Sequence, residues 1–223
     1  LGELINILSD ELSKEEISVY SLGERIKDLL TRYGLADTFG IAFLQPNGYL
    51  YYPYMKYIDD DRSGMSLEPE VKNLTRYVID KRIKLHIRDS LEETDLPNGY
   101  TILKLHGGLF TIYCVPIVYR SITRGAVLFE KQGKDQFSDS TIILFDKIVD
   151  IINLSLYFID ILKEVEEDRK KLFELSIKDY LTGAYSRRFL EQYLEKEMYK
   201  SKRMGTPLSV ICYIDRYRQI QGS

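Results

Sequence analysis

Hydrophobic and polar residues follow a helical period in the first part of the chain. Within residues 17–33 the apolar positions return every three or four residues, which predicts an amphipathic helix. Ser13 and Glu16 form a capping box at its start, and Gly34 is typical of its end.

Short runs rich in β-branched and aromatic residues come next and predict strands. They cover residues 39–44, 49–57, 85–87, 100–105, 109–118 and 125–130. Asn47-Gly48 stands between the first two runs and is typical of a β-hairpin turn. Between the second and third runs we expect a helix with Pro69 in its first turn and its end near Lys81.

A long helix is predicted from about Asp139 to Ser176, with Ser138 as its N-cap. It would extend roughly 55 Å at a rise of 1.5 Å per residue. Interrupted only by Asp168, its apolar residues form a heptad series at Ile151, Leu154, Phe158, Ile161, Val165, Leu172 and Leu175. This series favours a parallel coiled coil between two copies of the chain. The alternative is a solvated helix lying against its own domain.

The last part of the chain has a different pattern. A turn-rich segment leads to Ser186, which is placed to cap a helix that ends at Gly205, and residues 208–214 read as a buried strand. About 45 residues are too few to bury a proper core. We therefore interpret this part as the opening of an α/β domain, and the chain as a piece of something longer.

Composition and charge narrow the classes of function. The 31 basic and 34 acidic residues leave a net charge of -3, and the pI near 5.6 argues against a nucleic-acid-binding protein. The most apolar window, residues 141–165, contains Asp146, Lys147, Asp150 and Asp160, so we expect no membrane span. The chain has no secretory signal and only two cysteines, which suggests a cytoplasmic protein without disulfides.

Few side chains suggest catalysis or metal binding. Cys114 and Cys212 lie in apolar runs and are interpreted as small core residues. His86 and His106 lack neighbours at ligand spacing, so a metal role is not expected. A tyrosine cluster between residues 49 and 57 either stacks on a flat ligand or packs within the sheet, and alternation places only half of it on each face.

Residues from about Ser13 to Leu162 resemble a GAF domain. The resemblance rests on the order of four stretches: Ser66 to Asp89, Cys114-Val-Pro-Ile117, Gly125-Ala-Val-Leu-Phe129 and Phe137-Ser-Asp-Ser140 before a long helix. It implies an α+β fold in which helices flank an antiparallel sheet, and a small-molecule ligand whose identity and binding site the sequence leaves unknown.

The segment Asp179-Tyr-Leu-Thr-Gly-Ala-Tyr-Ser-Arg-Arg188 resembles the opening of a GGDEF, or diguanylate cyclase, domain. Residues 207–211 and 214–220 resemble the strand that follows it and that strand's continuation. The resemblance implies a motif that couples the linker helix to the cyclase domain, in which Asp179 pairs with one of the two arginines. Its residues are Asp179, Leu181, Thr182, Gly183, Arg187 and Arg188. Asp215 and Gln221 would be remnants of the nucleotide side.

Cyclases of this family condense two GTP molecules into cyclic di-GMP with a divalent metal, so Mg²⁺ and GTP are expected for an intact parent protein. Here Tyr213 or Ile214, depending on the register, replaces the family's metal-binding aspartate, and the Gly-Gly-(Asp/Glu)-Glu-Phe signature is absent. Magnesium prefers oxygen ligands, so the chain alone is predicted to be inactive, with no catalytic residue, metal ligand or cofactor of its own.

These observations divide the chain into a lead-in (1–12), a GAF sensor (13–150), a coiled-coil signalling helix (151–177) and a partial GGDEF domain (178–223). The leading hypothesis is a homodimeric bacterial signalling protein in which the sensor regulates a cyclase. The first alternative is a non-enzymatic ligand receptor with a degenerate GGDEF remnant. The second is an enzyme in the GAF domain, such as a free methionine sulfoxide reductase, although that part of the chain has a single cysteine.

Overall fold

The computed structural model describes residues 2, 6, 10, 18–93, 95–102, 108–178 and 182–211. It separates into two compact units, Leu1–Ile161 and Leu162–Ser223. None of the helices among the residues it describes is both long enough and apolar enough to cross a membrane.

The first unit is built on a six-stranded sheet in the order β3-β2-β1-β8-β7-β4, and every neighbouring pair is antiparallel. Its strands are β1 (Thr38–Leu44), β2 (Leu50–Lys56), β3 (Ser66–Leu67), β4 (Leu85–Ile87), β7 (Phe110–Tyr119) and β8 (Ile122–Gln132). A separate pair, β5 (Asp95–Leu96) and β6 (Tyr100–Thr101), is joined by the short helix η1 (Pro97–Gly99). The α+β fold with an antiparallel sheet is therefore confirmed.

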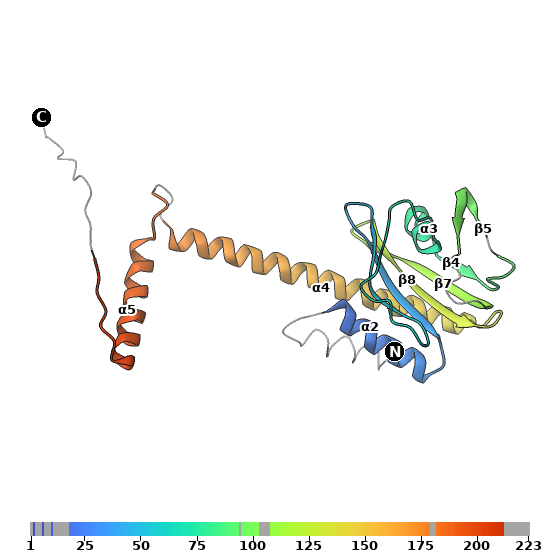
Figure 1. The fold of residues 1–223 in the computed structure, drawn as a ribbon, viewed down its shortest axis with the longest axis horizontal. Coiled ribbons are helices and arrows are strands. Elements are labelled where there is room, and N and C mark those ends of the chain that lie inside the picture. Colours follow the sequence, from blue (N-terminus) through green and yellow to red (C-terminus); the bar gives the residue numbers. More distant parts are fainter. Residues whose placement is uncertain are drawn as a thin grey trace, which may run out of the picture. The chain divides into compact units, whose positions relative to one another are not determined.

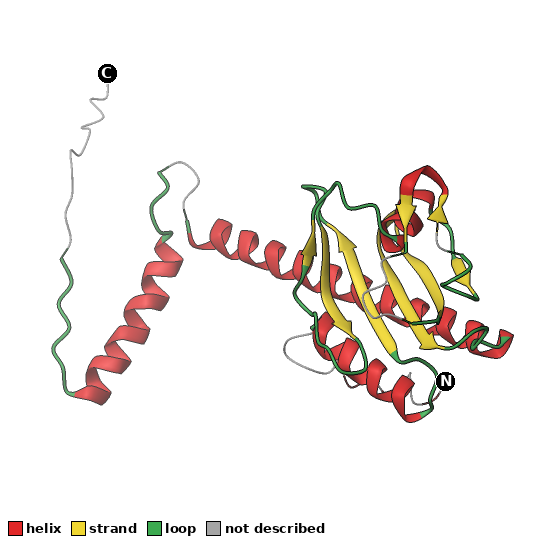
Figure 2. Cartoon of the chain, turned by 45° about the vertical axis from the view of Figure 1, so that its right-hand side comes forward, coloured by secondary structure: helices red, strands yellow, loops and turns green. Residues whose placement is uncertain are grey.

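Helices cover both faces of this sheet (Figures 1 and 2). Helix α2 (Val19–Arg32) and the N-terminal half of α4 (Asp139–Ile177) bury their apolar residues on one face, where Phe39, Phe129 and Phe145 lie at the centre of the core. Helix α3 (Leu74–Lys81) packs on the opposite face over a second apolar cluster. Alternate strand residues supply the two cores because successive side chains point to opposite faces.

Close packing explains a glycine in the middle of α2. A Cβ on Gly23 would lie 2.4 Å from the ring of Tyr54, which is fully buried against this helix. Glycine lowers helix propensity, but here it allows α2 to approach β2. The start predicted for this helix at Ser13 lies outside the described residues, and the described helix has Ser18 as its N-cap.

Local signals set most of the other boundaries. The hairpin turn at Asn47-Gly48 is confirmed, with Gly48 donating its backbone N–H to the carbonyl of Gln45 at 2.9 Å. The Ser138 hydroxyl accepts from the N–H of Thr141, and α4 runs from Asp139 to Ile177 as predicted. Helix α3 starts later than predicted, because the Asn73 side chain accepts from the N–H of Arg76 and caps the helix there.

The second unit contains the end of α4 and helix α5 (Arg187–Met204), whose N-terminus is capped by Ser186 as predicted. The strand predicted at residues 208–214 is wrong for its described part. Residues 208–211 form no strand, and Val210 and Ile211 are 63% and 93% exposed. A strand needs a hydrogen-bonded neighbour, and no neighbour pairs with these residues in the described part of the chain.

Candidate ligand-binding site

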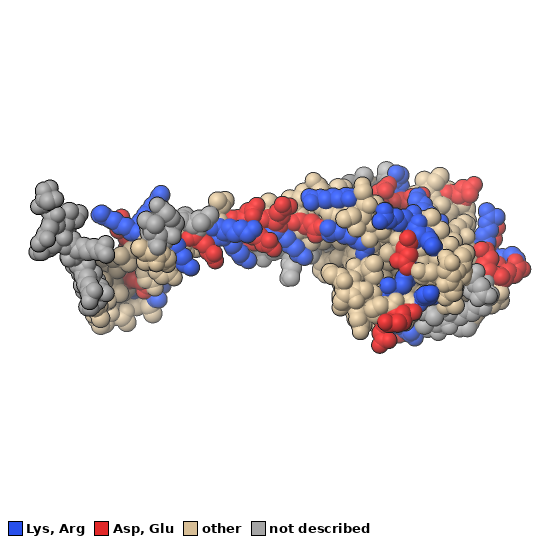
Figure 3. Space-filling view, turned by 90° about the horizontal axis from the view of Figure 1, so that it is seen from above, with Lys and Arg blue, Asp and Glu red and all other residues tan. Residues whose placement is uncertain are grey.

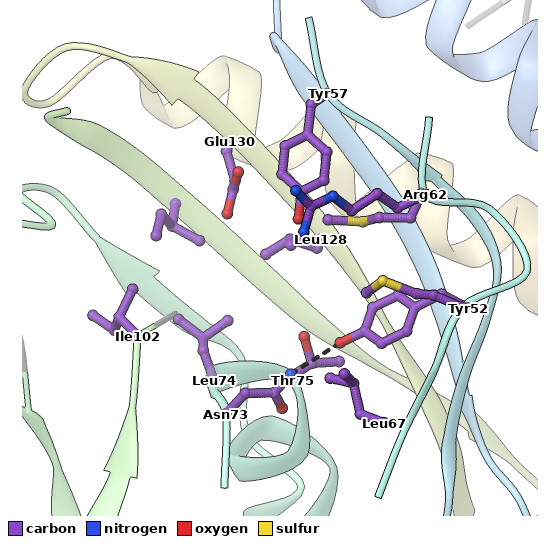
Figure 4. Close-up of a pocket in the computed structure, with 13 residues that line it drawn as sticks. Tyr52, Tyr57, Arg62, Leu67, Asn73, Leu74, Thr75, Ile102, Leu128 and Glu130 are labelled. Carbon is purple, nitrogen blue, oxygen red and sulfur yellow. Dashed lines mark hydrogen bonds between the residues drawn. The ribbon is translucent and has the colours of Figure 1, made fainter. Parts of the chain in front are cut away.

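A cavity of about 90 Å³ lies between α3 and the sheet, on the face opposite α2 and α4 (Figure 4). Apolar side chains form most of its wall, and four polar or charged residues interrupt it. The lining residues are Tyr52, Met55, Tyr57, Arg62, Met65, Leu67, Asn73, Leu74, Thr75, Ile102, Ile112, Leu128 and Glu130. An apolar hollow with a few polar groups is the usual form of a small-molecule site.

Small residues at the centre of the sheet leave room for this cavity. In β1 the large residues Phe39 and Ile41 face α2 and α4, whereas Ala42 belongs to the cluster on the cavity side. Gly40 alternates with them and points to the same face as Ala42. A Cβ on Gly40 would lie only 2.3 Å from the sulfur of Met55, so this side chain occupies the space that a larger residue at position 40 would need. The space above β1 is therefore shared between the cavity and a flexible methionine.

An irregularity in β2 brings two tyrosines to the same cavity. Ile41 is opposite Tyr54 and Phe43 is opposite Tyr51. Tyr52 and Pro53 of β2 therefore lie opposite a single residue of β1, the one between Ile41 and Phe43. This arrangement is a β-bulge, a position where proline is tolerated within a sheet. As a result Tyr52 and Tyr57 belong to the cavity side, while Tyr54 packs in the other core.

The floor of the cavity is polar and internally bonded. The Nδ2 of Asn73 donates to the hydroxyl of Tyr52 at 3.1 Å, and the Thr75 hydroxyl is a further partner of Tyr52. Burial raises the pKa of Tyr52 to about 12, so the phenol stays neutral. Both ends of the Asn73 carboxamide are engaged, since its Oδ1 accepts from the N–H of Arg76 and caps α3. The side chain of Asn73 thus joins the N-terminus of α3 to Tyr52 of the sheet at the floor of the cavity.

Glu130 places a carboxyl group in the wall. Loss of solvent around it raises its pKa to about 7, and the hydroxyl of Thr38, directly opposite on β1, opposes part of that shift by hydrogen bonding. No basic side chain of the described residues forms an ion pair with it. A carboxylate in an apolar wall without a cation is costly, and a bound cation or hydrogen-bond donor would remove that cost.

Arg62 places a positive charge on the other side of Tyr57. It is carried by the loop after β2, which follows that strand through hydrogen bonds from the N–H of Arg62 to Met55 and from the N–H of Gly64 to Tyr52. The Nε of Arg62 donates to Asp60 at 2.6 Å, and the guanidinium lies 5.6 Å from the centre of the Tyr57 ring. Its side chain is 37% exposed, so it stands at the cavity entrance.

Metal-binding side chains and the one cysteine of this region define what further chemistry the site offers. Among the described residues no cluster of histidine, cysteine or carboxylate side chains could hold a metal ion. Cys114 is fully buried beneath the cavity wall, and burial raises the pKa of its thiol well above the ordinary value. A thiol of this kind is a poor nucleophile.

The residues predicted to form the linker-coupling motif are only partly described. Asp179, Leu181, Tyr213, Ile214, Asp215 and Gln221 lie outside the described residues, and with them the predicted pairing of Asp179 with an arginine. Thr182 and Gly183 form a turn in which the Thr182 hydroxyl accepts from the N–H of Ala184. Arg187 pairs with Glu191 at 2.8 Å, one turn along α5, and Arg188 lines a hollow with Phe173 and Tyr193.

The ligand site was not predicted from the sequence, although two features of the sequence indicate the cavity. In β1, residues 38, 40 and 42 are small and alternate with large apolar residues, which indicates a hollow on one face of the sheet. In β8, Ala126, Leu128 and Glu130 share a face, so an acid occupies an inward position. The contribution of Arg62 had no such signal, because a loop carries it.

No protein-family model matches the sequence, and a sequence comparison with curated proteins finds no match. Solved structures do share the fold. A methyl-accepting chemotaxis protein, residues 122 to 287, superposes with a TM-score of 0.57 at 14% identity, over 70% of this chain and 98% of that one.

A GAF domain from an Acinetobacter phosphoenolpyruvate-protein phosphotransferase has a TM-score of 0.55 at 13% identity, over 70% of this chain and 92% of its own. A phycocyanobilin-bound GAF domain from a cyanobacterial phytochrome has a TM-score of 0.54 at 13% identity, with the same two coverages, 70% and 92%. At these identities the likeness establishes the fold, which is that of a GAF domain.

Proposed function

We propose that the chain is the sensory part of a signalling protein and that its GAF domain binds a small molecule between α3 and the sheet. The observation that carries this proposal is the cavity itself, which has an apolar wall and places Glu130 and Arg62 around Tyr57. The GAF fold supports it further, since one structure with this fold holds a bilin.

Strand β8 offers a route from the cavity to α4. Leu128 and Glu130 line the cavity, and the residue between them, Phe129, packs in the opposite core against Phe145 of α4. A ligand that moves β8 would therefore act directly on the helix. Such a ligand shifts a conformational equilibrium only by its difference in affinity for the two states.

We further propose that α4 pairs with α4 of a second copy. Leu154, Phe158, Val165 and Leu172 are between 37% and 67% exposed, and their spacing follows the heptad a and d positions. Acidic and basic side chains are interspersed along the C-terminal part of the helix (Figure 3), as around the seam of a coiled coil. A second copy would cover this apolar stripe.

The output of the parent protein is proposed to be a GGDEF diguanylate cyclase that uses GTP and Mg²⁺. The support is the motif at residues 179–188 and its position directly after the long helix. The alternative is a receptor without enzymatic activity, favoured by Tyr213 or Ile214 at the position of the metal-binding aspartate. We expect no cyclic di-GMP from this chain with GTP and Mg²⁺, and formation of that product would overturn the assignment of the chain as inactive.

The sensor proposal is tested by a small-molecule screen that measures the thermal shift of the full chain. Ile112 lines the cavity, so the variant Ile112→Phe fills it with a larger side chain. The control variant Ile143→Phe makes the same change on α4 at a side chain that is 61% exposed. Compounds that bind in the cavity should raise the Tm of the wild type and of Ile143→Phe, and not that of Ile112→Phe. Compounds that stabilise all three proteins equally would place the ligand elsewhere.

A further inference from the structure

Two opposite charges line the same cavity without neutralising each other. The carboxylate of Glu130 has the Thr38 hydroxyl as its hydrogen-bond partner, and no ion pair joins it to Arg62. In Figure 4 the side chain of Arg62 reaches the ring of Tyr57, and Glu130 lies on the other side of that ring. Both charges are therefore presented to a molecule bound between them.

The guanidinium retains binding capacity. Asp60 accepts from Nε, and within the described part of the chain no hydrogen bond involves the two terminal Nη groups, whose four N–H donors suit a carboxylate. The guanidinium also lies over the Tyr57 ring, 5.6 Å from its centre, where a cation is attracted to the ring face. The ion pair with Asp60 thus uses Nε and leaves the outer edge of the guanidinium for an anion.

The cavity is small, and apolar side chains form the wall above its internally bonded polar floor. Leu74, Ile102, Ile112 and Leu128 surround it, and its volume is about 90 Å³. An enclosed cavity of about 150 Å³ accepts a benzene molecule, so this one accepts an aliphatic group of about four heavy atoms. The cavity therefore has room for a short branched chain, and the charged groups of such a ligand would lie beside Glu130 in the wall and Arg62 at the entrance.

We propose that the ligand is a free α-amino acid with a short aliphatic side chain, whose ammonium binds Glu130, whose carboxylate binds Arg62, and whose side chain occupies the apolar cavity. This inference rests on the proposed sensor function and names the ligand class of that same site. In an α-amino acid a single carbon carries the ammonium, the carboxylate and the side chain, so one small molecule offers a partner to Glu130, to Arg62 and to the apolar wall.

The test is isothermal titration calorimetry of the full chain with leucine and three compounds that each lack part of it. Isopentylamine lacks the carboxylate, isocaproate lacks the ammonium, and isopentanol lacks both charges. Each charge-assisted contact contributes enough to change affinity by about tenfold or more. Leucine should therefore bind at least about tenfold more tightly than either singly charged compound, and isopentanol most weakly.

Two variants assign the contacts. Glu130→Gln should weaken the binding of leucine by about tenfold and leave the affinity for isocaproate unchanged. Arg62→Gln should weaken the binding of leucine by a similar factor and leave the affinity for isopentylamine unchanged. Asp60→Asn is the matched control, because it removes the charge of the ion pair in the loop but keeps the guanidinium and an amide oxygen that can accept from its Nε. It should bind leucine as tightly as the wild type does.

The outcomes separate the two proposals. If isopentanol binds as tightly as leucine, the amino-acid assignment is wrong and the cavity remains a binding site. Equal losses in Arg62→Gln and Asp60→Asn would show that Arg62 only supports the loop, which also overturns the assignment. If none of the four compounds binds, the amino-acid ligand is rejected, and only the absence of any hit in the wider screen rejects the sensor.

Discussion

The rings of Phe129 in β8 and Phe145 in α4 lie flat against each other, with centroids 4.1 Å apart and planes inclined by 4°. Phe129 stands between Leu128 and Glu130, which face the cavity on the other side of the sheet. One strand thus forms both the cavity wall and the surface on which the long helix rests. This contact is a direct physical link between the strand that lines the cavity and α4.

Truncation of this contact should destabilise the domain. Phe145 is fully buried, so Phe145→Ala leaves a cavity and should lower the free energy of unfolding by about 3–5 kcal/mol. Phe173→Ala makes the same change on α4 at a side chain that is 59% exposed, and should alter it by less than about 0.5 kcal/mol. Urea unfolding measures both, and equal effects would contradict the assigned packing.

Stability should depend on pH through Glu130. Its pKa is raised from 4.5 to about 7, so the folded state holds this proton more tightly than the unfolded state does. The free energy of unfolding should therefore fall as pH rises from about 4.5 to about 7, by at most about 3 kcal/mol, and stay low above that range.

The variant Glu130→Gln isolates this effect. The lowered pKa of His86 acts in the opposite direction as pH rises, so only the difference between the two proteins reports on Glu130. Glu130→Gln should be more stable than the wild type at about pH 8, with the difference shrinking toward about pH 4. Parallel stability curves, measured by urea unfolding across this range, would show that Glu130 is not desolvated.

Two glycines in the central strands should respond differently to alanine. A Cβ on Gly125 would lie 2.0 Å from the backbone oxygen of Ala42, and the strands must separate to admit it. A Cβ on Gly40 meets the sulfur of Met55, which can rotate away. We expect Gly125→Ala to lower the free energy of unfolding by about 2–4 kcal/mol and Gly40→Ala to lower it by less than about 1.5 kcal/mol, measured by thermal or urea unfolding. The reverse order would contradict the register of β1 and β8.

The oligomeric state should depend on the apolar stripe of α4. Leu172 is 67% exposed at a heptad position, so Leu172→Glu should shift a dimer toward monomer. Lys170→Glu places the same side chain two residues away, off the stripe, and should leave the dimer intact. Light scattering coupled to size-exclusion chromatography measures both. A monomeric wild type, or dimers in both variants, would show that the stripe does not join two copies.

The sequence by itself determined the elements whose signals are local. The Asn47-Gly48 turn, the caps at Ser138 and Ser186 and the extent of α4 were predicted correctly, because each depends on residues a few positions apart. The alternation of large and small residues in β1, which leaves room for the cavity on one face of the sheet, can also be read from the sequence. Residues 208–211 show the limit of local signals, since their apolar pattern resembles a strand but no neighbouring strand pairs with them among the described residues.

Only the tertiary structure decided the site. The bulge at Tyr52 and Pro53 reverses the alternation of β2, so Tyr52 and Tyr57 share a face that strict alternation would deny them. The raised pKa of Glu130 comes from the loss of solvent beneath α3 and the loops, and the position of Arg62 comes from a loop bonded along β2. Burial and register join residues dozens of positions apart, and neither is encoded in any short stretch of sequence.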